Sequence, residues 1–409
     1  MAELRQNTWT TDAWYDQYVA GTQGDYQGTV EMWNVGQDDN GDIGANSRSF
    51  PGPSSPIQIP AGSGAWKTGA VGQGAQLAIK TDGTLWTWGE PNKGENGMNL
   101  PSNSSRYSSP TQVGANTDWS SLTKAAGNGQ VLLVKTDGTL WGMGSNYEAG
   151  TLGDGTIVDR SSPIQIGTDT TWSNKASKTA VFGRGTGARC VKTDGTMWVW
   201  GENNYGNFGT NQNPSDLAKA SSPVQMGTST DWAHACRVYQ QGLAIKTDGT
   251  LWAWGDNEWG SIGNNSKTKY SSPVQIPGTW LYATEAQEWA VLGIRTNGTL
   301  WAWGYNTDGK FGRNNTYPTP GQYTNFSSPV QVGSDNTWKW INGGTSSLRA
   351  IKTDGSLWAW GRQGKGGFGV NTDAISYSSP TQIGTRTVWE NSQTNAGHYW
   401  DQSMFFTNI

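Results

Sequence analysis

Apolar and polar residues alternate along this chain in short runs, and the same pattern of runs returns about every 54 residues. In one copy, residues 243–246 lead into a Thr-Asp-Gly turn and residues 250–254 lead out of it. Alternating runs on either side of Asp-Gly predict a β-hairpin, and the turn expected there is type I′, with positive φ at both central residues. A third strand is expected at residues 271–276, and a fourth begins near Trp280.

Seven copies of this pattern are present, and one of them is divided between the two ends of the chain. Seven Ser-Ser-Pro prolines mark the copies: Pro56, Pro110, Pro163, Pro223, Pro273, Pro329 and Pro380. Only six complete hairpins accompany them, with the turn residues Asp82, Asp137, Asp194, Asp248, Asn297 and Asp354. Residues 31–36 match the second half of a hairpin, and residues 403–408 match its first half. We therefore expect strands from the two termini to pair.

A four-stranded unit repeated at this period, without helical periodicity, is typical of a propeller blade. A linear solenoid would instead need atypical capping repeats at both ends. The sequence therefore predicts an all-β fold, a seven-bladed β-propeller with four-stranded antiparallel blades, whose last blade is closed by both termini. We expect residues 27–409 to form the propeller and residues 1–26 to form an N-terminal docking arm.

A second motif follows the hairpin, Trp-Gly-x-Asn-x-x-Gly-x-x-Gly, at residues 200–209, 254–263 and 303–312. It resembles the regulator-of-chromosome-condensation repeat in its bacterial and phage form, and the resemblance covers residues 27–409. The resemblance implies a seven-bladed propeller. The histidine that eukaryotic members often carry ahead of the first hairpin strand is absent at residues 72–76 and 127–130, which argues against transferring the nuclear exchange-factor activity.

The composition of the chain argues against nucleic acids as binding partners and against a membrane span. Charged residues make up 15% of the chain and the net charge is −4, with no cluster of Lys and Arg, so direct nucleic-acid binding is not expected. No apolar run approaches the roughly 18 residues of a membrane span, and no signal peptide is visible at the start. Cys190 and Cys236 lie in neighbouring repeats; we favour buried free thiols over a disulfide, and the sequence leaves the pairing open.

Tryptophan is abundant, with 25 residues, which suggests a lectin. Nineteen of them, however, recur at three fixed positions of the repeat, where packing between blades explains them. The first position holds Trp33, Trp86, Trp141, Trp198, Trp252, Trp301 and Trp358; the second holds Trp88, Trp200, Trp254, Trp303 and Trp360; the third holds Trp66, Trp119, Trp172, Trp232, Trp280, Trp338 and Trp389. The repeat does not require Trp9, Trp14, Trp259, Trp289, Trp340 and Trp400.

The chain is poor in catalytic chemistry. His234 and His398 are its only histidines, and no nucleophile-elbow or zinc-protease motif occurs. The glycine-rich residues 183–187 are not followed by the helix that a phosphate loop needs. Residues 38–42 could bind a hard cation, but a copy of the repeat turn is the favoured interpretation. We predict that the chain is not an enzyme, with no catalytic residue, no cofactor and no metal site.

Two segments exceed the repeat and carry candidate partner-binding residues. The arm contains Trp9, Trp14, Tyr15 and Tyr18, which either fold back on the ring or dock on another subunit. The insertion at 305–326 is 22 residues long, against 15 in the preceding repeat, and it holds Tyr305, Tyr317, Tyr323 and Phe326. Extra length with unexplained aromatics predicts a recognition loop.

These features together favour a non-enzymatic structural or attachment protein of a bacteriophage virion, with an exposed propeller for protein or host-surface recognition. Abundant Gly, Ser, Thr and Asn with few charges is typical of virion proteins and adhesins. The expected partners are other virion proteins, through the arm, and a host-surface glycan or protein. The alternatives are a carbohydrate-binding propeller at the cell surface or outside the cell and, by family analogy alone, a guanine-nucleotide exchange factor or protein inhibitor.

Overall fold

The computed structural model describes most of the propeller predicted from the sequence. The described residues are 30–35, 43–46, 57–62, 65–71, 75–90, 93–100, 106–124, 129–182, 186–212, 214–236, 240–286, 289–306, 309–314, 325–344, 347–362, 376–389 and 403–408. The predicted docking arm, residues 1–26, lies outside them, as do residues 38–42.

Four of the sheets are antiparallel meanders of four strands each. The first contains β3 (Trp66–Ala70), β4 (Gln76–Lys80), β5 (Leu85–Gly89) and β6 (Tyr107–Gln112); the second contains β7 (Trp119–Lys124), β8 (Val131–Lys135), β9 (Leu140–Gly144) and β10 (Arg160–Gln165). The third contains β11 (Thr179–Phe182), β12 (Gly187–Val191), β13 (Met197–Glu202) and β14 (Lys219–Gln225); the fourth contains β22 (Trp338–Gly343), β23 (Ser347–Lys352), β24 (Leu357–Arg362) and β25 (Ser376–Gln382).

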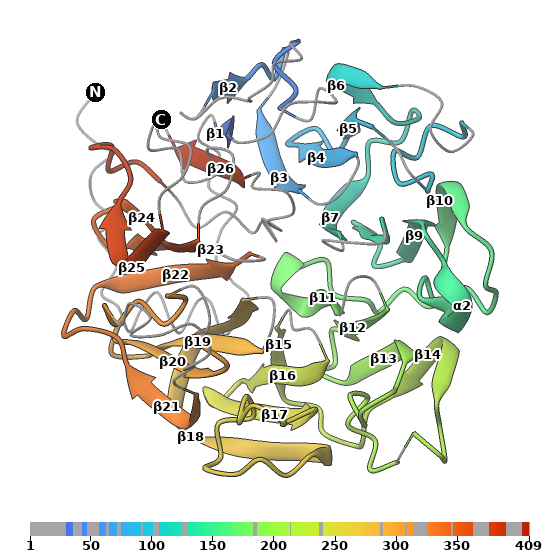
Figure 1. Ribbon diagram of the computed structural model, residues 1–409. Coiled ribbons are helices and arrows are strands. Elements are labelled where there is room, and N and C mark those ends of the chain that lie inside the picture. Colours follow the sequence, from blue (N-terminus) through green and yellow to red (C-terminus); the bar gives the residue numbers. More distant parts are fainter. Residues whose placement is uncertain are drawn as a thin grey trace.

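A fifth sheet joins two such meanders through one long strand. It contains β15 (Trp232–Ala235), β16 (Gln241–Lys246), β17 (Thr250–Gly255), β18 (Tyr270–Ala286), β19 (Ala290–Arg295), β20 (Leu300–Gly304) and β21 (Phe326–Gln331). The first part of β18 pairs with β17, and the part from Trp280 onward pairs with β19. The sheets are arranged around a ring (Figure 1), so the predicted all-β propeller is confirmed. The helix α2 (Tyr147–Gly150) and the 3₁₀ turn Ala176–Lys178 lie in connections.

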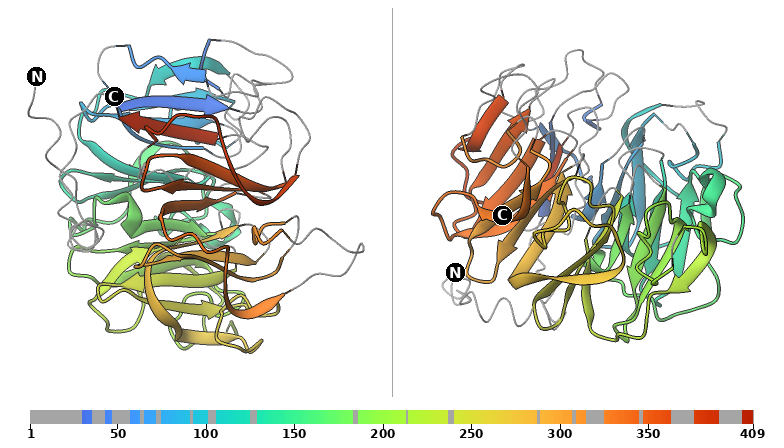
Figure 2. Two further views of the ribbon diagram at one scale, coloured as in Figure 1. Left: turned by 90° about the vertical axis from the view of Figure 1, so that its left-hand side faces the viewer. Right: turned by 60° about the horizontal axis from the view of Figure 1, so that its bottom comes forward.

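The remaining sheet brings the two ends of the chain together. Strand β26 (Ser403–Asn408) pairs antiparallel with β1 (Val30–Val35) along its whole length, from Val30 opposite Asn408 to Val35 opposite Ser403. Strand β2 (Ile57–Ile59) pairs with the other edge of β1. Figure 2 shows β1 and β26, from opposite ends of the colour scale, side by side.

The hairpin turns differ from the expected type. Gly83 has a φ of 79°, whereas Asp82 is not among the residues with positive φ, so the type I′ expectation is wrong. The Gly83 N–H donates to the Lys80 carbonyl (3.0 Å) and the Lys80 N–H to the Thr84 carbonyl (3.0 Å). This is a three-residue loop, a type I turn followed by a left-handed glycine in a bulge. Asp82 suits its place because its carboxylate accepts bonds from the N–H and hydroxyl of Thr84.

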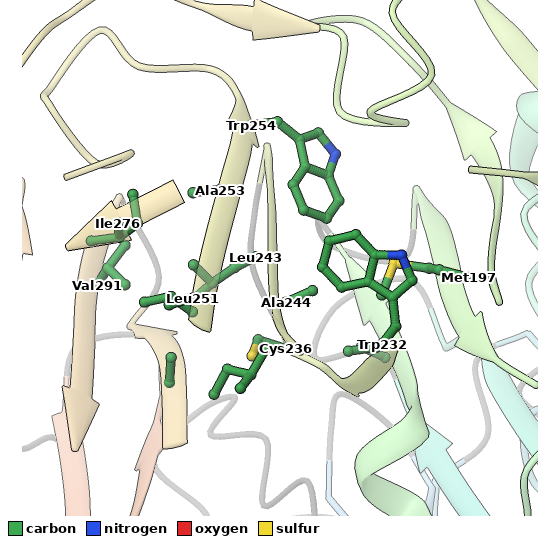
Figure 3. Close-up of a cluster of buried hydrophobic side chains, with 14 of the residues drawn as sticks. Met197, Trp232, Cys236, Leu243, Ala244, Leu251, Ala253, Trp254, Ile276 and Val291 are labelled. Atoms are coloured by element: carbon green, nitrogen blue, oxygen red, sulfur yellow. The ribbon is translucent and has the colours of Figure 1, made fainter. Parts of the chain in front are cut away.

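The three tryptophan positions have distinct environments. Indoles at the second and third positions are buried, whereas those at the first, including Trp252, are partly exposed. Trp232 and Trp254 pack at 6.1 Å between ring centroids within a cluster that also contains Met197 and Leu243 (Figure 3). Cys236 lies in the same cluster, and both Cys236 and Cys190 are buried free thiols, as expected.

Indoles at the second position also bond one blade to the next. In four of them the Nε1–H donates to a backbone carbonyl in the glycine-rich turn of the preceding blade: Trp200 to Thr151 (2.9 Å), Trp254 to Asn207 (2.9 Å), Trp303 to Ser261 (2.9 Å) and Trp360 to Lys310 (2.8 Å). These residues are 42 to 50 positions apart in the chain. We call this contact the indole latch.

Candidate functional site

Antiparallel strands give the propeller two faces of different character. The Thr-Asp-Gly turns lie at one end of the strands, and we call that end the hairpin face. The connections that precede β16 or β19 and follow β17 or β20 lie at the other end, which we call the loop face. Binding residues in such folds are usually on loops held by a rigid scaffold, so residues of either face that the repeat does not explain are candidates for binding.

On the hairpin face, each complete hairpin holds a cation over two indole rings. Lys352, for example, lies 3.7 Å from the ring centroid of Trp358 and 4.8 Å from that of Trp338. The equivalent cations are Lys80, Lys135, Lys192, Lys246 and Arg295. Each of these side chains covers one indole from the first position and one from the third, a favourable cation–π geometry.

We call each cation with its two indoles a hairpin clamp, and carboxylates pair with the cation in four of them. Lys135 pairs with Asp118 at 3.1 Å and Lys246 with Asp231 at 3.1 Å, while Lys192 pairs with Asp169. Burial alone would raise the pKa of Asp169, but hydrogen bonds from Lys192 and Thr171 and the charge of Lys192 lower it to about 2. Burial would likewise raise the pKa of Asp335, but hydrogen bonds from Lys352 and Thr337 and the charge of Lys352 lower it to about 2. The recurring Lys-Thr-Asp-Gly-Thr-Leu-Trp segment is therefore structural.

On the loop face, the glycine-rich turns reach from one blade to the next. Asn265 has a φ of 59°, and its N–H donates to the carbonyl of Ser327, the first serine of the next Ser-Ser-Pro (2.7 Å). The same bond is made by Asn46, Asn99, Asn211 and Asn314. In the sixth turn that the structure describes, Gly155 takes the place of asparagine, with a φ of 78° and a bond to Ser221 of 2.8 Å. In these six turns the position is held by Asn or Gly, which tolerate a left-handed backbone.

The aromatic cluster lies on the loop face at one junction between blades and consists of Trp259, Trp289 and Tyr305. All three side chains are partly exposed. The ring centroids of Trp259 and Tyr305 are 4.6 Å apart, those of Trp289 and Tyr305 are 6.3 Å apart, and those of the two indoles are 6.4 Å apart. Trp259 comes from the turn after β17, and the other two come from the next blade.

The repeat framework positions the aromatic cluster. The indole latch from Trp303 to Ser261 holds the turn that contains Trp259 against the neighbouring blade. The Tyr305 N–H donates to the Trp289 carbonyl (3.0 Å). A Cβ on Gly304 would lie 2.1 Å from that same carbonyl oxygen, so only glycine allows the two loops to meet here. The N–H of Trp289 donates to Oε1 of the buried Glu285 (2.9 Å).

The structure brings together only part of the predicted recognition loop. Tyr305 belongs to the aromatic cluster, whereas Phe326 begins β21 and packs on Phe311 at 5.8 Å, so it has a packing role. Tyr317 and Tyr323 lie outside the described residues, as do Trp9, Trp14, Tyr15 and Tyr18 of the arm, and their roles stay predictions. Trp259 and Trp289 had been set apart from the repeat by their positions, but the sequence did not show that they meet.

Burial shifts the pKa of several ionisable groups toward their uncharged forms. Burial, together with the charge of Lys178, lowers the pKa of His234 to about 3, and burial lowers the pKa of Lys178 to about 8. Burial raises the pKa of Cys190 and of Cys236 to about 12, so both thiols are protonated. Arg189 donates to the carbonyls of Asn207 and Gln241 and so ties neighbouring blades together.

The part of the chain that the structure describes contains neither a metal-binding cluster nor a membrane-spanning helix. No group of three or more His, Cys, Asp and Glu side chains in them is arranged to hold a metal ion. No helix among them is long and apolar enough to cross a membrane.

Comparison with known proteins shows what this architecture resembles. Residues 248–280 match the regulator of chromosome condensation (RCC1) repeat. They run from a hairpin turn through the second hairpin strand and the motif after it to the next Ser-Ser-Pro strand. Relatives and solved structures of the same family match over much larger parts of the chain. The chain is an RCC1-like β-propeller.

Curated relatives of this RCC1-like propeller are distant and longer. The ultraviolet-B receptor UVR8 of Arabidopsis thaliana is 28% identical over 256 residues, which are 61% of this chain and 54% of UVR8. The human E3 ubiquitin-protein ligase HERC2 is 24% identical over 51% of this chain and 4% of its own length. The matched part is thus about half of UVR8 and a small part of HERC2.

Solved structures share the fold of the RCC1-like propeller over nearly its full length. Human WBSCR16 superimposes with a TM-score of 0.74 and 16% identity, covering 93% of this chain and 99% of that one. Prp20p of Saccharomyces cerevisiae, described with its binding properties to Gsp1p and histones, gives a TM-score of 0.74 and 15% identity, covering 98% and 94%. At such identities the likeness concerns the fold alone.

The clamps on the hairpin face predict how stability depends on pH. Asp169 and Asp335 have pKa values of about 2 in the folded chain, below the ordinary 3.8, so their contribution is present above about pH 4 and lost as the pH falls toward 2. We expect the Asp169→Asn/Asp335→Asn double variant to melt below the unchanged protein at pH 7, with the difference disappearing near pH 2. Thermal unfolding at several pH values measures this.

The matched control is Asp216→Asn, which alters an exposed carboxylate outside the clamps. A gap in Tm between the double variant and the unchanged protein that is the same at pH 7 and at pH 2 would contradict the predicted role of the two carboxylates.

Proposed function

We propose that this chain is a non-enzymatic protein-interaction module whose binding surface is on the loop face. The aromatic cluster is the observation that carries this proposal. Tryptophan and tyrosine anchor protein interfaces because they bury a large area with few rotatable bonds. The recurring cations and indoles of the hairpins and of the indole latch have defined roles within the propeller. The repeat does not require Trp259, Trp289 or Tyr305.

The family supports an interaction role in general terms. Prp20p, which shares the fold, is described with binding to Gsp1p and to histones. The fold does not name a ligand, so neither partner is transferred to this chain. Guanine-nucleotide exchange and protein inhibition therefore remain family analogies.

We further propose that the chain is a structural or attachment protein of a bacteriophage particle. The supporting features are its charge-poor composition rich in Gly, Ser, Thr and Asn, and an aromatic segment ahead of the ring that could anchor it to a neighbouring virion protein. A carbohydrate-binding propeller is the second candidate, favoured by the partly exposed indoles of Trp259 and Trp289.

We infer that the ring has seven blades and that the sheet formed by β2, β1 and β26 is the closing blade. Seven Ser-Ser-Pro segments and a hairpin divided between the termini support this inference. The pairing of β1 with β26 and the burial of Met404 and Phe406 beside Met32 are consistent with it.

Removing the closing strand should open the ring. Deletion of residues 403–409 takes away the strand beside β1 and the buried Met404 and Phe406, and it exposes a strand edge that can pair with another chain. We expect a clearly lower Tm and concentration-dependent aggregation, measured by thermal unfolding and light scattering. A truncated chain that stays monodisperse with an unchanged Tm would contradict closure by this strand.

The proposed anchor is tested in particles. We expect full-length protein with Trp9, Trp14, Tyr15 and Tyr18 all changed to Ser to keep its Tm but to be lost from purified particles, as measured by quantitative mass spectrometry. The control is the otherwise unchanged protein with the single substitution Tyr305→Ser. This substitution alters the loop face, and the protein should still be incorporated into particles. Normal copy number of the arm variant would show that the propeller makes the attachment, and absence of the unchanged protein from particles would overturn the virion role.

A further inference from the structure

We propose that the aromatic cluster is a clamp for a basic side chain, arginine or lysine, of a partner protein. The proposal rests on the interaction role proposed above and names the chemistry that the site would recognise. Its basis is a similarity between two places in the molecule. The rings of the aromatic cluster have the geometry of the indole pairs that hold cations on the hairpin face.

On the hairpin face, cations lie over pairs of indoles arranged edge to face. Trp172 and Trp198 have centroids 6.2 Å apart and ring planes at 72°, with Lys192 3.9 Å from the centroid of Trp198. Trp338 and Trp358 are 5.8 Å apart at 76°, with Lys352 held at 3.7 Å from the centroid of Trp358. Trp33 in β1 and Trp389 form a similar pair at 6.5 Å and 76°, and Arg386 lies 4.7 Å from the centroid of Trp33.

Trp289 and Tyr305 reproduce this geometry on the loop face. Their centroids are 6.3 Å apart and their planes meet at 76°, within the range of the cation-holding pairs. Trp259 adds a third ring, 4.6 Å from Tyr305. Indole and phenol faces attract cations through their quadrupole, and tryptophan does so most strongly.

Charge at the aromatic cluster suits a cation. The carboxylate of Glu258, adjacent to Trp259 in the chain, is exposed. The buried carboxylate of Glu285 holds the backbone of Trp289, although part of its field is balanced by Arg189. Asp256 is already paired with Lys269 at 3.1 Å, so Glu258 is the carboxylate that we assign to the incoming cation.

The backbone of Trp289 indicates that its side chain is retained for binding. Its φ is 63°, a conformation that is unfavourable for a bulky residue. Gly129 occupies the corresponding position eight residues before the hairpin turn residue of its own repeat, with a φ of 72°. The corresponding Thr186 and Gln240 are not among the residues with positive φ, so the repeat does not impose this backbone. An indole at Trp289 therefore carries strain that the repeat does not need.

The preceding blade junction lacks the same set. There the corresponding residues are Tyr205, Gln240 and Asp256, so a single aromatic replaces three, and Tyr205 already lies against Lys269 at 4.8 Å. This junction supplies a matched control on the same face of the same molecule.

The test uses the full-length protein labelled with 5-fluorotryptophan and followed by ¹⁹F NMR. The probe is acetyl-Gly-Arg-Gly-amide, and its neutral counterpart carries citrulline in place of arginine. The signals of Trp259 and Trp289 are assigned as those lost in Trp259→Phe and Trp289→Gly. We expect the arginine peptide to shift these signals in a saturable way, and the citrulline peptide to bind roughly tenfold more weakly or not at all.

Three variants separate binding from folding. Trp289→Gly should keep the Tm, since glycine suits the left-handed backbone and retains the N–H bond to Glu285. It should lower the affinity for the arginine peptide by roughly tenfold. Glu258→Gln alters one exposed carboxylate and should lower the affinity for the arginine peptide without a change in Tm. This variant therefore tests the proposal even if Trp289→Gly does not fold. Tyr205→Ala, at the preceding junction, should leave binding unchanged.

Two outcomes would overturn the proposal. Equal shifts with the arginine and citrulline peptides would show that charge is not recognised. A response to methyl glycosides at lower concentration than to the arginine peptide would assign the aromatic cluster to saccharides. Either result leaves the virion role to be decided separately by particle composition.

Discussion

The indole latch is the contact on which the rest of the ring depends. A propeller blade buries its faces only against its neighbours, so its stability depends on the interface between adjacent blades. The second tryptophan of a repeat fills that space and donates its N–H to a carbonyl of the preceding turn, as Trp254 does to Asn207. A buried carbonyl left without a donor is costly, so the latch fixes blade spacing as well as filling volume.

The latch explains why the turns are rich in glycine. A Cβ on Gly209 would lie 2.7 Å from Nε1 of Trp254, and one on Gly263 would lie 2.7 Å from Nε1 of Trp303. The turn must pass directly over the indole of the next blade, and the asparagine two residues later then reaches that blade's Ser-Ser-Pro strand. The volume of the indole, its hydrogen bond and the conformation of the turn therefore constrain one another. Trp259 and Trp289 are informative because these constraints do not require an aromatic residue at either position.

Much of the architecture could be predicted because it follows from local rules repeated in register. Alternation and Asp-Gly gave the hairpins, and the divided copy indicated that β1 would pair with β26. The turn type was wrong because Asp82 serves Thr84 through its side chain, a three-residue geometry that the dipeptide alone does not distinguish. The meeting of Trp259 with Tyr305 could not be predicted either, since they belong to different repeats and the distance between blades is set by packing.

The central claim is that the second tryptophan joins blades while the first serves its own hairpin, and matched substitutions test it directly. Trp254→Phe and Trp252→Phe each remove one indole N–H, from Asn207 of the preceding blade and from Thr250 of the same hairpin respectively. Urea unfolding should show a loss of about 2 kcal/mol or more for Trp254→Phe, since a buried carbonyl loses its donor and a cavity forms. Trp252→Phe, at a partly exposed site, should cost less than about 1 kcal/mol. Equal losses would contradict the assignment of the latch to the second tryptophan.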